Sequence, residues 1–355
     1  MDSVIRRLRT ELGKAELDCA LVTSLPNIRY LSGFTSDEAA LFITDRSQYL
    51  FTDFRYTIQA EEQAPAFEVI DINGRPFADC IAGVLQNEKC KRCAFEESTM
   101  SVGAFRAYEK LPFAFEPWSA QFNALRIIKM AEELDRLQKA QAIADRAYAE
   151  LLKRIRSGMT EKQVAAELNY IGACLDSEGP SFDTIVGSGP NGAMCHAIPS
   201  DRPLQNGDLV VVDFGCMYGG YHSDMTRTFG VGSVSDECRH IYDIVLEAHN
   251  RALNAVKPGI NGRDLHMIAA DYIAENGYGD CFGHGLGHGF GLEIHEMPRA
   301  SVKSVSVLEP GMTITIEPGI YVEGLCGVRI EDCVAVTENG YLDFVSSPKE
   351  LLVIE

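Results

Sequence analysis

Residues 282–296 read FGHGLGHGFGLEIHE and contain three of the chain's eight histidines, His284, His288 and His295. The three histidines fall within twelve residues and are spaced by small glycines. We therefore expect the functional site of the chain to lie around this stretch.

Four acidic residues flank the histidine stretch, two on each side, and each belongs to an apolar, strand-like run. Asp213 ends DLVVVDFG, and Asp224 lies on the returning strand after a turn with two glycines. Glu317 ends TITIEP, and Glu331 lies in GVRIEDCVAV after a similar reversal. Two hairpins that face each other would bring the four carboxylates together. With one imidazole, this pattern indicates a carboxylate-bridged pair of divalent metals and predicts a metal-dependent hydrolase.

The expected cofactor is two divalent metal ions per subunit. An oxygen-rich donor set with one imidazole suits Mn²⁺, Co²⁺, Fe²⁺ or Zn²⁺, and we expect Mn²⁺ first. Two such ions, about 3.5–4 Å apart, can bind a water between them, lower its pKa and polarise a carbonyl oxygen. A nearby carboxylate can then accept the proton of that water.

Each of these residues also has an ordinary structural interpretation. Asp213 or Asp224, taken alone, is usually a turn or cap residue at the end of a strand. Glu331 could be half of a buried ion pair with Arg329, which lies two positions earlier on the same strand face. His196 could be a hydrogen-bonded imidazole in the core. Their joint occurrence favours a single metal site.

Composition and charge narrow the class of protein. The chain has 355 residues, enough for two domains. The net charge of −19 argues against nucleic-acid binding. No apolar run is long enough to span a membrane, and the N-terminus has no signal-peptide core. The eleven cysteines suit free thiols in a reducing cytoplasm. The one CxxC, Cys90 and Cys93, has no second pair and is interpreted as chance.

Strands and helices alternate in the first part of the chain, which predicts a small α/β domain over residues 1–124. Pro112 and Pro117 then interrupt regular structure. The expected strands cover residues 18–24, 38–44, 47–53, 67–72 and 91–97, and the expected helices cover Ser3–Lys14, Tyr56–Ala64, Pro76–Gln86 and Ser101–Lys110.

The second domain, residues 125–355, shows a weak internal repeat. A long amphipathic helix over 126–155 and a second helix, Glu161–Asp176 with a cap at Thr160, precede the first strands. The same order recurs with helices over 236–256 and 262–276, followed by strands to Val336. The metal-type acids occur only in the strands that follow each helix pair.

Long stretches of the chain resemble the pita-bread metallopeptidases, the family of methionine aminopeptidase, aminopeptidase P and prolidase. The matching pieces are FDTIVGSGPNGAMCHAIPSDR, GDLVVVDFGCMYGGYHSDMTRT, GHGLGHGFGLEIHE, TIEPGIY and GVRIEDCVAV. SLPNIRYLSGFTSDEAALFIT resembles the extra N-terminal domain of the proline-specific branch. The resemblance implies an α+β fold, with a creatinase-type N-terminal α/β domain before a pita-bread domain.

The resemblance also assigns roles to individual residues. The five metal ligands of the family fall on Asp213, Asp224, His288, Glu317 and Glu331. Glu317 also matches the acid proposed to accept the water proton. His196 matches a histidine on the leaving-group side, and His295 one that contacts the scissile peptide group. His284 matches a further histidine of the substrate pocket, and Arg329 an arginine bonded to the ligand shell.

The expected activity is hydrolysis of the peptide bond before proline, in a cytoplasmic homodimer. In that dimer, the resemblance implies that the N-terminal domain of one subunit helps to wall the active site of the other. A dipeptidase needs a cation for the free carboxylate of proline, and the candidates are His284, His295, Arg299 and Arg329. None stands out as a dedicated clamp, so we expect aminopeptidase P, with an Xaa-Pro dipeptidase (prolidase) as the alternative.

Two other classes of protein share the fold. Creatinase-like hydrolysis needs no metal, and the five intact ligands oppose it. Some relatives are binding proteins without activity, but they typically lose ligands or add charged tails, and this chain does neither.

Overall fold

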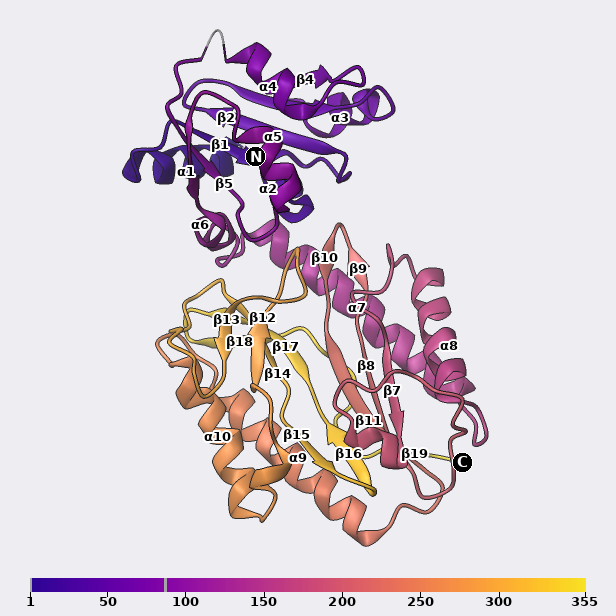
Figure 1. Cartoon of the computed structure of the whole chain (residues 1–355). Coiled ribbons are helices and arrows are strands. Elements are labelled where there is room, and N and C mark those ends of the chain that lie inside the picture. Colours follow the sequence, from indigo (N-terminus) through magenta and orange to yellow (C-terminus); the bar gives the residue numbers. More distant parts are fainter. Residues whose placement is uncertain (1, 86–87) are drawn as a thin grey trace. The chain divides into compact units, whose positions relative to one another are not determined.

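The protein is described by a computed structural model covering residues 2–85 and 88–355. The chain divides into two compact units, Met1–Arg126 and Ile127–Glu355 (Figure 1). Both units mix helices and strands, in agreement with the expected α+β class.

The first unit is built on a six-stranded sheet with the order β4-β3-β2-β1-β5-β6. β1 pairs antiparallel with β2 and parallel with β5, so the sheet is mixed. Five of its strands fall where the alternating apolar runs predicted them. The strands are β1 (Cys19–Val22), β2 (Ala39–Thr44), β3 (Gln48–Thr52), β4 (Glu68–Asp71), β5 (Arg92–Phe95) and β6 (Ala114–Pro117).

Six helices accompany this sheet: α1 (Asp2–Lys14), α2 (Leu25–Ser32), α3 (Thr57–Gln63), α4 (Phe77–Val84), α5 (Val102–Tyr108) and α6 (Ser119–Ala124). Of the expected helix Pro76–Gln86, residue 86 lies outside the described residues. The interpretation of Pro112 and Pro117 as ending regular structure was wrong at β6. A proline is tolerated there because β6 is an edge strand that ends at Pro117.

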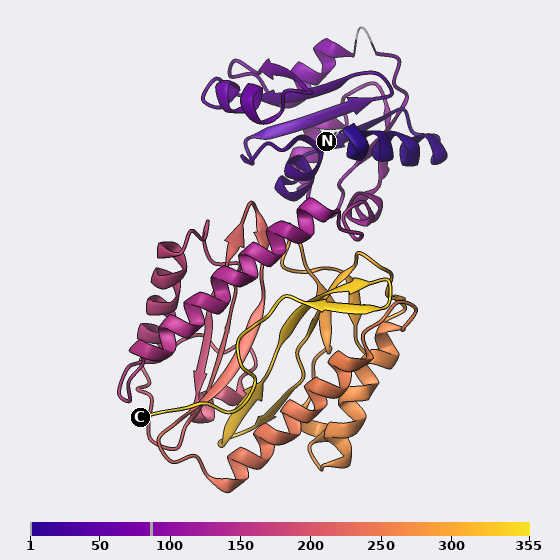
Figure 2. The ribbon, with the colours of Figure 1, turned by 180° about the vertical axis from the view of Figure 1, so that it is seen from behind.

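The second unit repeats a pair of helices followed by strands, as the sequence predicted. The helices are α7 (Ala131–Arg154), α8 (Glu161–Cys174), α9 (Asp236–Ala255) and α10 (Gly262–Glu275). Thr160 caps α8, since its hydroxyl accepts a hydrogen bond from the N–H of Gln163. Figure 2 shows α7 and α9 in front of the strands, so helices cover one face of the curved sheets.

The strands of the second unit form two main sheets, which are antiparallel except for the parallel pair β11–β19. One sheet has the order β19-β11-β8-β7, the other β14-β17-β18, and three strand pairs complete the unit. The strands are β7 (Ile185–Ser188), β8 (Leu209–Phe214), β9 (Met217–Tyr218), β10 (Tyr221–His222), β11 (Met225–Val231), β12 (Gly287–Gly289), β13 (Glu296–Ala300), β14 (Thr313–Ile316), β15 (Gly319–Val322), β16 (Cys326–Arg329), β17 (Asp332–Thr337), β18 (Gly340–Asp343) and β19 (Val353–Ile354).

The core of the second unit lies between α9, α10 and the strands of the second half. The helices contribute apolar side chains such as Ile241, Val245 and Leu265, which are fully or almost fully buried. They pack in one cluster with Ile314 and Val328. Packing of this apolar face fixes the backs of β14 and β16, whose ends carry the acids.

Two expectations from composition can be compared with the fold. All eleven cysteines are free thiols in the structure. Among the residues that the structure describes, no helix is long and apolar enough to span a membrane.

Candidate active site

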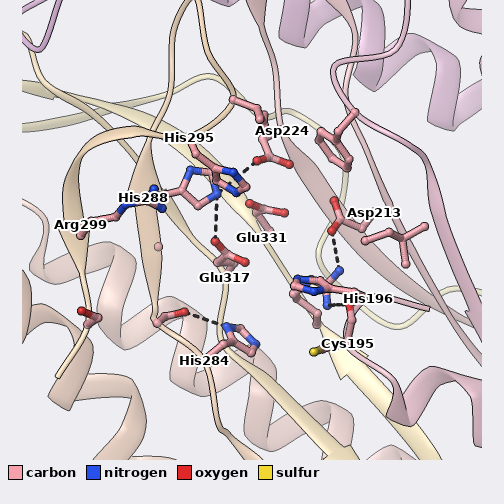
Figure 3. Close-up of a pocket in the computed structure, with 17 residues that line it drawn as sticks. Cys195, His196, Asp213, Asp224, His284, His288, His295, Arg299, Glu317 and Glu331 are labelled. Carbon is pink, nitrogen blue, oxygen red and sulfur yellow. Dashed lines mark hydrogen bonds and ion pairs between the residues drawn. The ribbon is translucent and has the colours of Figure 1, made fainter. Parts of the chain in front are cut away.

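A pocket of about 430 Å³ in the second unit collects the acids and histidines identified in the sequence (Figure 3). Its wall includes all nine candidate residues: His196, Asp213, Asp224, His284, His288, His295, Glu317, Arg329 and Glu331. Residues from distant parts of the chain therefore meet at one place.

The first pair of acids comes from the β8–β11 hairpin. Phe214 pairs with Met225 across the two antiparallel strands, so Asp213 and Asp224 lie close to the same end of the ladder. Gly219 and Gly220, with φ of 59° and 77°, form the turn between them. Both carboxylates are buried, with the residues 9% and 4% exposed.

The second pair comes from β14 and β17 in the second half. Ile316 pairs with Asp332, so Glu317 and Glu331 lie just beyond that pair and face the same pocket. Glu331 had been expected on a strand, but it lies in the break between β16 and β17. Its N–H donates to the carbonyl of Thr226, at 3.1 Å, and this bond joins the two halves of the site.

His288 lies on β12 and reaches the acids because glycines flank it. A Cβ at Gly287 would stand 1.9 Å from the carbonyl oxygen of Thr315, so only glycine allows β12 to approach β14 this closely. The Nε2 atom of His288 lies 3.6 Å from Asp224 and 3.4 Å from Glu317. Figure 3 shows the imidazole directed at these carboxylates.

The hydrogen bonding of His288 identifies which ring nitrogen faces the acids as an acceptor. Nδ1 lies 3.1 Å from the carbonyl oxygen of Gly289, which can only accept, so Nδ1 carries the proton. Burial lowers the pKa of His288 to about 3, so the ring is neutral. Its Nε2 lone pair therefore faces carboxylate oxygens, and a cation placed between them would satisfy both.

The charge of the site leads to the same conclusion. Burial, followed by the neighbouring acids, raises the pKa of Asp224 and of Glu331 well above the usual range. Burial also raises the pKa of Glu317 to about 7, although Arg329 opposes the shift. The guanidinium of Arg329 therefore offsets only part of the negative charge of the clustered carboxylates.

Within the part of the chain that the structure describes, two carboxylate oxygens at the site have no hydrogen-bond partner and are free to bind a metal ion. Oδ1 of Asp213 and Oε1 of Glu331 are buried and have no hydrogen-bond partner among the described residues. Ligand atoms of Asp224, His288 and Glu331 lie within 4.8 Å of one another. Buried oxygens without partners, beside an imidazole lone pair, are the donor set that divalent cations require.

Arg329 holds the site together through four acceptors. Its Nη2 donates to Asp213 at 2.5 Å, and its Nε donates to the hydroxyl of Thr226 at 3.0 Å. Its Nη1 donates to the carbonyl of Cys195 and to the hydroxyl of Tyr321. Asp213 is therefore its carboxylate partner, and the simple Arg329–Glu331 ion pair considered from the sequence is not formed.

Arg227 supports the acids from behind. Its guanidinium is 1% exposed and uses all five N–H groups. It donates to the carbonyls of Thr226 and Glu331, to the carboxylate of Asp332 and to two carbonyls of residues 347–348. The backbone of both hairpins is thus held in one fixed arrangement beside the pocket.

His196 and His295 occupy the open side of the pocket. Both residues are exposed, so His196 is not the core imidazole considered from the sequence. The ring of His295 stands edge-on to His288, with 4.4 Å between the ring centroids. Figure 3 shows His295 beside His288.

His284 is held differently, because both of its ring nitrogens have partners in the protein. Nδ1 lies 2.8 Å from the carbonyl of Gly285, and Nε2 lies 2.9 Å from the hydroxyl of Tyr321. Burial lowers its pKa to about 4, so the ring is neutral. His284 therefore has no free ring nitrogen to offer a substrate, and only the ring itself contributes to the pocket wall. Tyr321 had no signal in the sequence, because a tyrosine in an apolar strand is usually a core residue.

Arg299 adds a cation to the pocket wall. It lies on β13, where it is the register partner of His288 on β12. Its side chain is exposed and makes no hydrogen bond or ion pair with the residues that the structure describes. From the sequence, Arg299 could not be distinguished from a solvated loop residue.

Comparison with known families places both parts of the chain. A model described as "Metallopeptidase family M24" matches residues 135–338, and one described as "Creatinase/Prolidase N-terminal domain" matches residues 5–128. A curated relative named Xaa-Pro dipeptidase, from Pyrococcus horikoshii, is 36% identical over 359 residues and covers 99% of each chain. The family resemblance and the two-part fold inferred from the motifs are confirmed.

Solved structures extend this similarity. An Xaa-Pro dipeptidase from Bacillus anthracis is 40% identical, covers 99% of both chains and superposes with a TM-score of 0.96. An X-Pro aminopeptidase from Thermotoga maritima is 37% identical and superposes with a TM-score of 0.90. The alignment covers 96% of this chain and 98% of the aminopeptidase.

Proposed function

The chain belongs to metallopeptidase family M24, and from this premise we propose that it is a metal-dependent Xaa-Pro dipeptidase. The proposal places the free carboxylate of the substrate's proline against Arg299. The unpaired guanidinium of Arg299 on the pocket wall is the observation that carries it. The relatives named as Xaa-Pro dipeptidases point the same way.

This reverses the preference derived from the sequence. Aminopeptidase P was expected because no dedicated carboxylate clamp stood out. Among the four candidates considered, the nitrogens of His284 are occupied and Arg329 is bonded to Asp213. The relatives support the dipeptidase alternative better than the aminopeptidase, although one solved neighbour is named an X-Pro aminopeptidase.

Metal binding is assigned to Asp213, Asp224, His288, Glu317 and Glu331. Divalent ions held there would lower the pKa of a water towards neutrality and polarise the scissile carbonyl. Mn²⁺ is the ion we propose, because an oxygen-rich set with one imidazole suits it.

The chain's own residues then divide the remaining work. Glu317, at the pocket wall, accepts the proton of the attacking water. His295 contacts the scissile peptide group, and His196, on the open side, provides the proton for the leaving proline nitrogen. The tertiary amide before proline has no N–H, so the substrate is held by its ends and its carbonyl.

Replacing Arg299 with alanine tests the proposed clamp. Hydrogen bonds to charged groups contribute about 1.5–3 kcal/mol, so kcat/KM for an Xaa-Pro dipeptide should fall about 10- to 100-fold. Hydrolysis of the same dipeptide with an amidated C-terminus should change little, because no carboxylate is present. The measurement compares initial rates of the metal-loaded enzymes on both substrates.

Arg263→Ala is the matched control, since Arg263 is an exposed arginine outside the pocket wall. It should leave both rates unchanged. Equal cleavage of Xaa-Pro and Xaa-Pro-Yaa-Zaa by the unmodified enzyme would instead identify an aminopeptidase P.

A cytoplasmic homodimer is part of the same proposal, with the N-terminal unit of one subunit walling the pocket of the other. Both units carry exposed apolar side chains that suit an interface. Phe54 and Ile58 on the first unit are 75% and 74% exposed, and Met194 and Ile198 beside His196 are 54% and 87% exposed.

Light scattering should report twice the mass of one chain at working concentrations. The double variant Phe54→Asp/Ile58→Asp should shift that mass towards the monomer, because it places charge in an apolar contact. Val102→Asp, at another exposed apolar position of the same unit, should leave the mass unchanged. A monomeric unmodified protein would contradict the proposal.

A further inference from the structure

Glu161 is a buried carboxylate outside the pocket wall, at the first position of α8. It is 0% exposed and accepts hydrogen bonds on both oxygens. Oε1 accepts from the N–H and the hydroxyl of Ser188, at 2.8 and 2.7 Å. Oε2 accepts from the N–H and the hydroxyl of Ser200, at 3.0 and 2.6 Å. The amide of Asn191 lies 3.1–3.2 Å from both oxygens.

The two serines bracket the loop that carries His196. Ser188 ends β7, and the chain then runs through a short helical turn, Gly189–Ala193, to His196 and on to Ser200. One side chain thus fixes both ends of this loop. The backbone adds a further tie, since the N–H of Lys162 donates to the carbonyl of Ser200 at 3.1 Å.

The middle of the loop is held close to the reacting centre. Arg329, which is bonded to Asp213, also donates to the carbonyl of Cys195 at 3.1 Å. A Cβ at Gly327 would lie 1.8 Å from the carbonyl oxygen of Gly192, so the loop lies against β16 with no space for a side chain.

His196 itself has no such support. Its ring is exposed and makes no hydrogen bond or ion pair with the residues that the structure describes. Its position is therefore set by the backbone of residues 188–200. The charge of Glu161 persists in this setting, because hydrogen bonds from both serines keep its pKa below the usual value although burial alone would raise it.

We propose that Glu161 is the positioning residue for His196, holding both ends of its loop so that the imidazole meets the leaving group. This inference rests on the proposed role of His196 in Xaa-Pro hydrolysis. Glu161 touches neither substrate nor metal in this proposal, and it acts only through the loop.

Glu161→Gln is the variant that tests this role. Its amide keeps the shape of the side chain but turns one acceptor into a donor that faces serine donors. Misplacement by about 1 Å can cost about 10²-fold, so kcat for an Xaa-Pro dipeptide should fall 10- to 100-fold with metal content unchanged. In a His196→Ala background, Glu161→Gln should cause no further loss of kcat, because the imidazole that Glu161 positions is absent.

Hydrogen–deuterium exchange provides a measurement that does not depend on activity. Deuterium uptake over residues 188–200 should rise in Glu161→Gln, since the N–H of Ser188 or of Ser200 loses its acceptor oxygen. If His196→Ala leaves turnover intact, the proposed role of His196 fails. The exchange data then show by themselves whether Glu161 holds the loop of residues 188–200 in place. Ser200→Ala, which removes one donor, should give smaller changes in the same direction and serves if Glu161→Gln does not fold.

The first unit contains a matched control. Glu96 is 1% exposed and accepts from the N–H of Thr23, from the N–H and hydroxyl of Ser24 and from the amide of Asn27, a similar set of donors. Glu96→Gln should lower the unfolding temperature similarly but leave kcat and uptake over 188–200 unchanged. Unchanged uptake in Glu161→Gln, or loss of activity that multiplies with that of His196→Ala, would overturn the proposal.

Discussion

Replacing Glu317 with glutamine is expected to abolish turnover while the protein stays folded. The side chain follows β14, lines the pocket and stands 3.4 Å from Nε2 of His288. An amide cannot accept the proton of the attacking water, and it bridges metal ions poorly. Loss of the base alone should cost about 10²–10⁴-fold, and loss of a metal ligand adds to that. The measurement is kcat on an Xaa-Pro dipeptide at saturating metal.

Glu323→Gln is the control, because Glu323 is an exposed acid on the hairpin between β15 and β16. It should retain full activity. Circular dichroism should show that Glu317→Gln keeps the native secondary structure. Activity of Glu317→Gln within tenfold of the unmodified enzyme would rule out both roles assigned to this residue.

The second large effect is expected at His288 and His295, whose ring centroids lie 4.4 Å apart but whose replacement should have different consequences. His288→Ala should lose metal and activity together, since Nε2 of His288 faces Asp224 and Glu317. His295→Ala should keep its metal and lose about 10²–10⁴-fold in kcat, as expected for a group that acts on the substrate. Metal content by elemental analysis and kcat are measured on the same samples.

His240→Ala is the control for both metal content and kcat, because His240 is exposed on α9 and absent from the pocket wall. Both quantities should equal those of the unmodified enzyme. The opposite pattern, with metal lost from His295→Ala and retained in His288→Ala, would show that the ligand histidine had been assigned incorrectly.

Five of the six strands of the first unit were predictable because they are short apolar runs bounded by polar residues. α2 was missed, since its eight residues begin with Leu25-Pro26 and are too few for a clear helical period. The long helix α7 starts at Ala131 rather than near residue 126, because the N–H of Lys129 bonds to Gly311 far along the chain. Contacts of that kind have no local signal.

The candidate metal site was predictable for a related reason. Glu317 closes an apolar run, where an acid conflicts with its surroundings and therefore stands out. Asp213 alone could have been a turn residue, and it was assigned because the other acids and the histidine occur with it. Glu161 has a polar sequence context, and its importance comes from serines located beyond residue 187. Arg299 was visible but ambiguous, because only the register of β12 and β13 brings it opposite His288.

The division of the acids between two structural halves has a consequence for biosynthesis. Asp213 and Asp224 leave the ribosome before His288, Glu317 and Glu331 are made, so the first half alone presents two of the acids without the imidazole of His288. When the second half docks, its carboxylates approach those of the first and repel them. Metal uptake would then complete the maturation of a finished chain, and the cell's supply of divalent ions would set how much of the newly made enzyme becomes active.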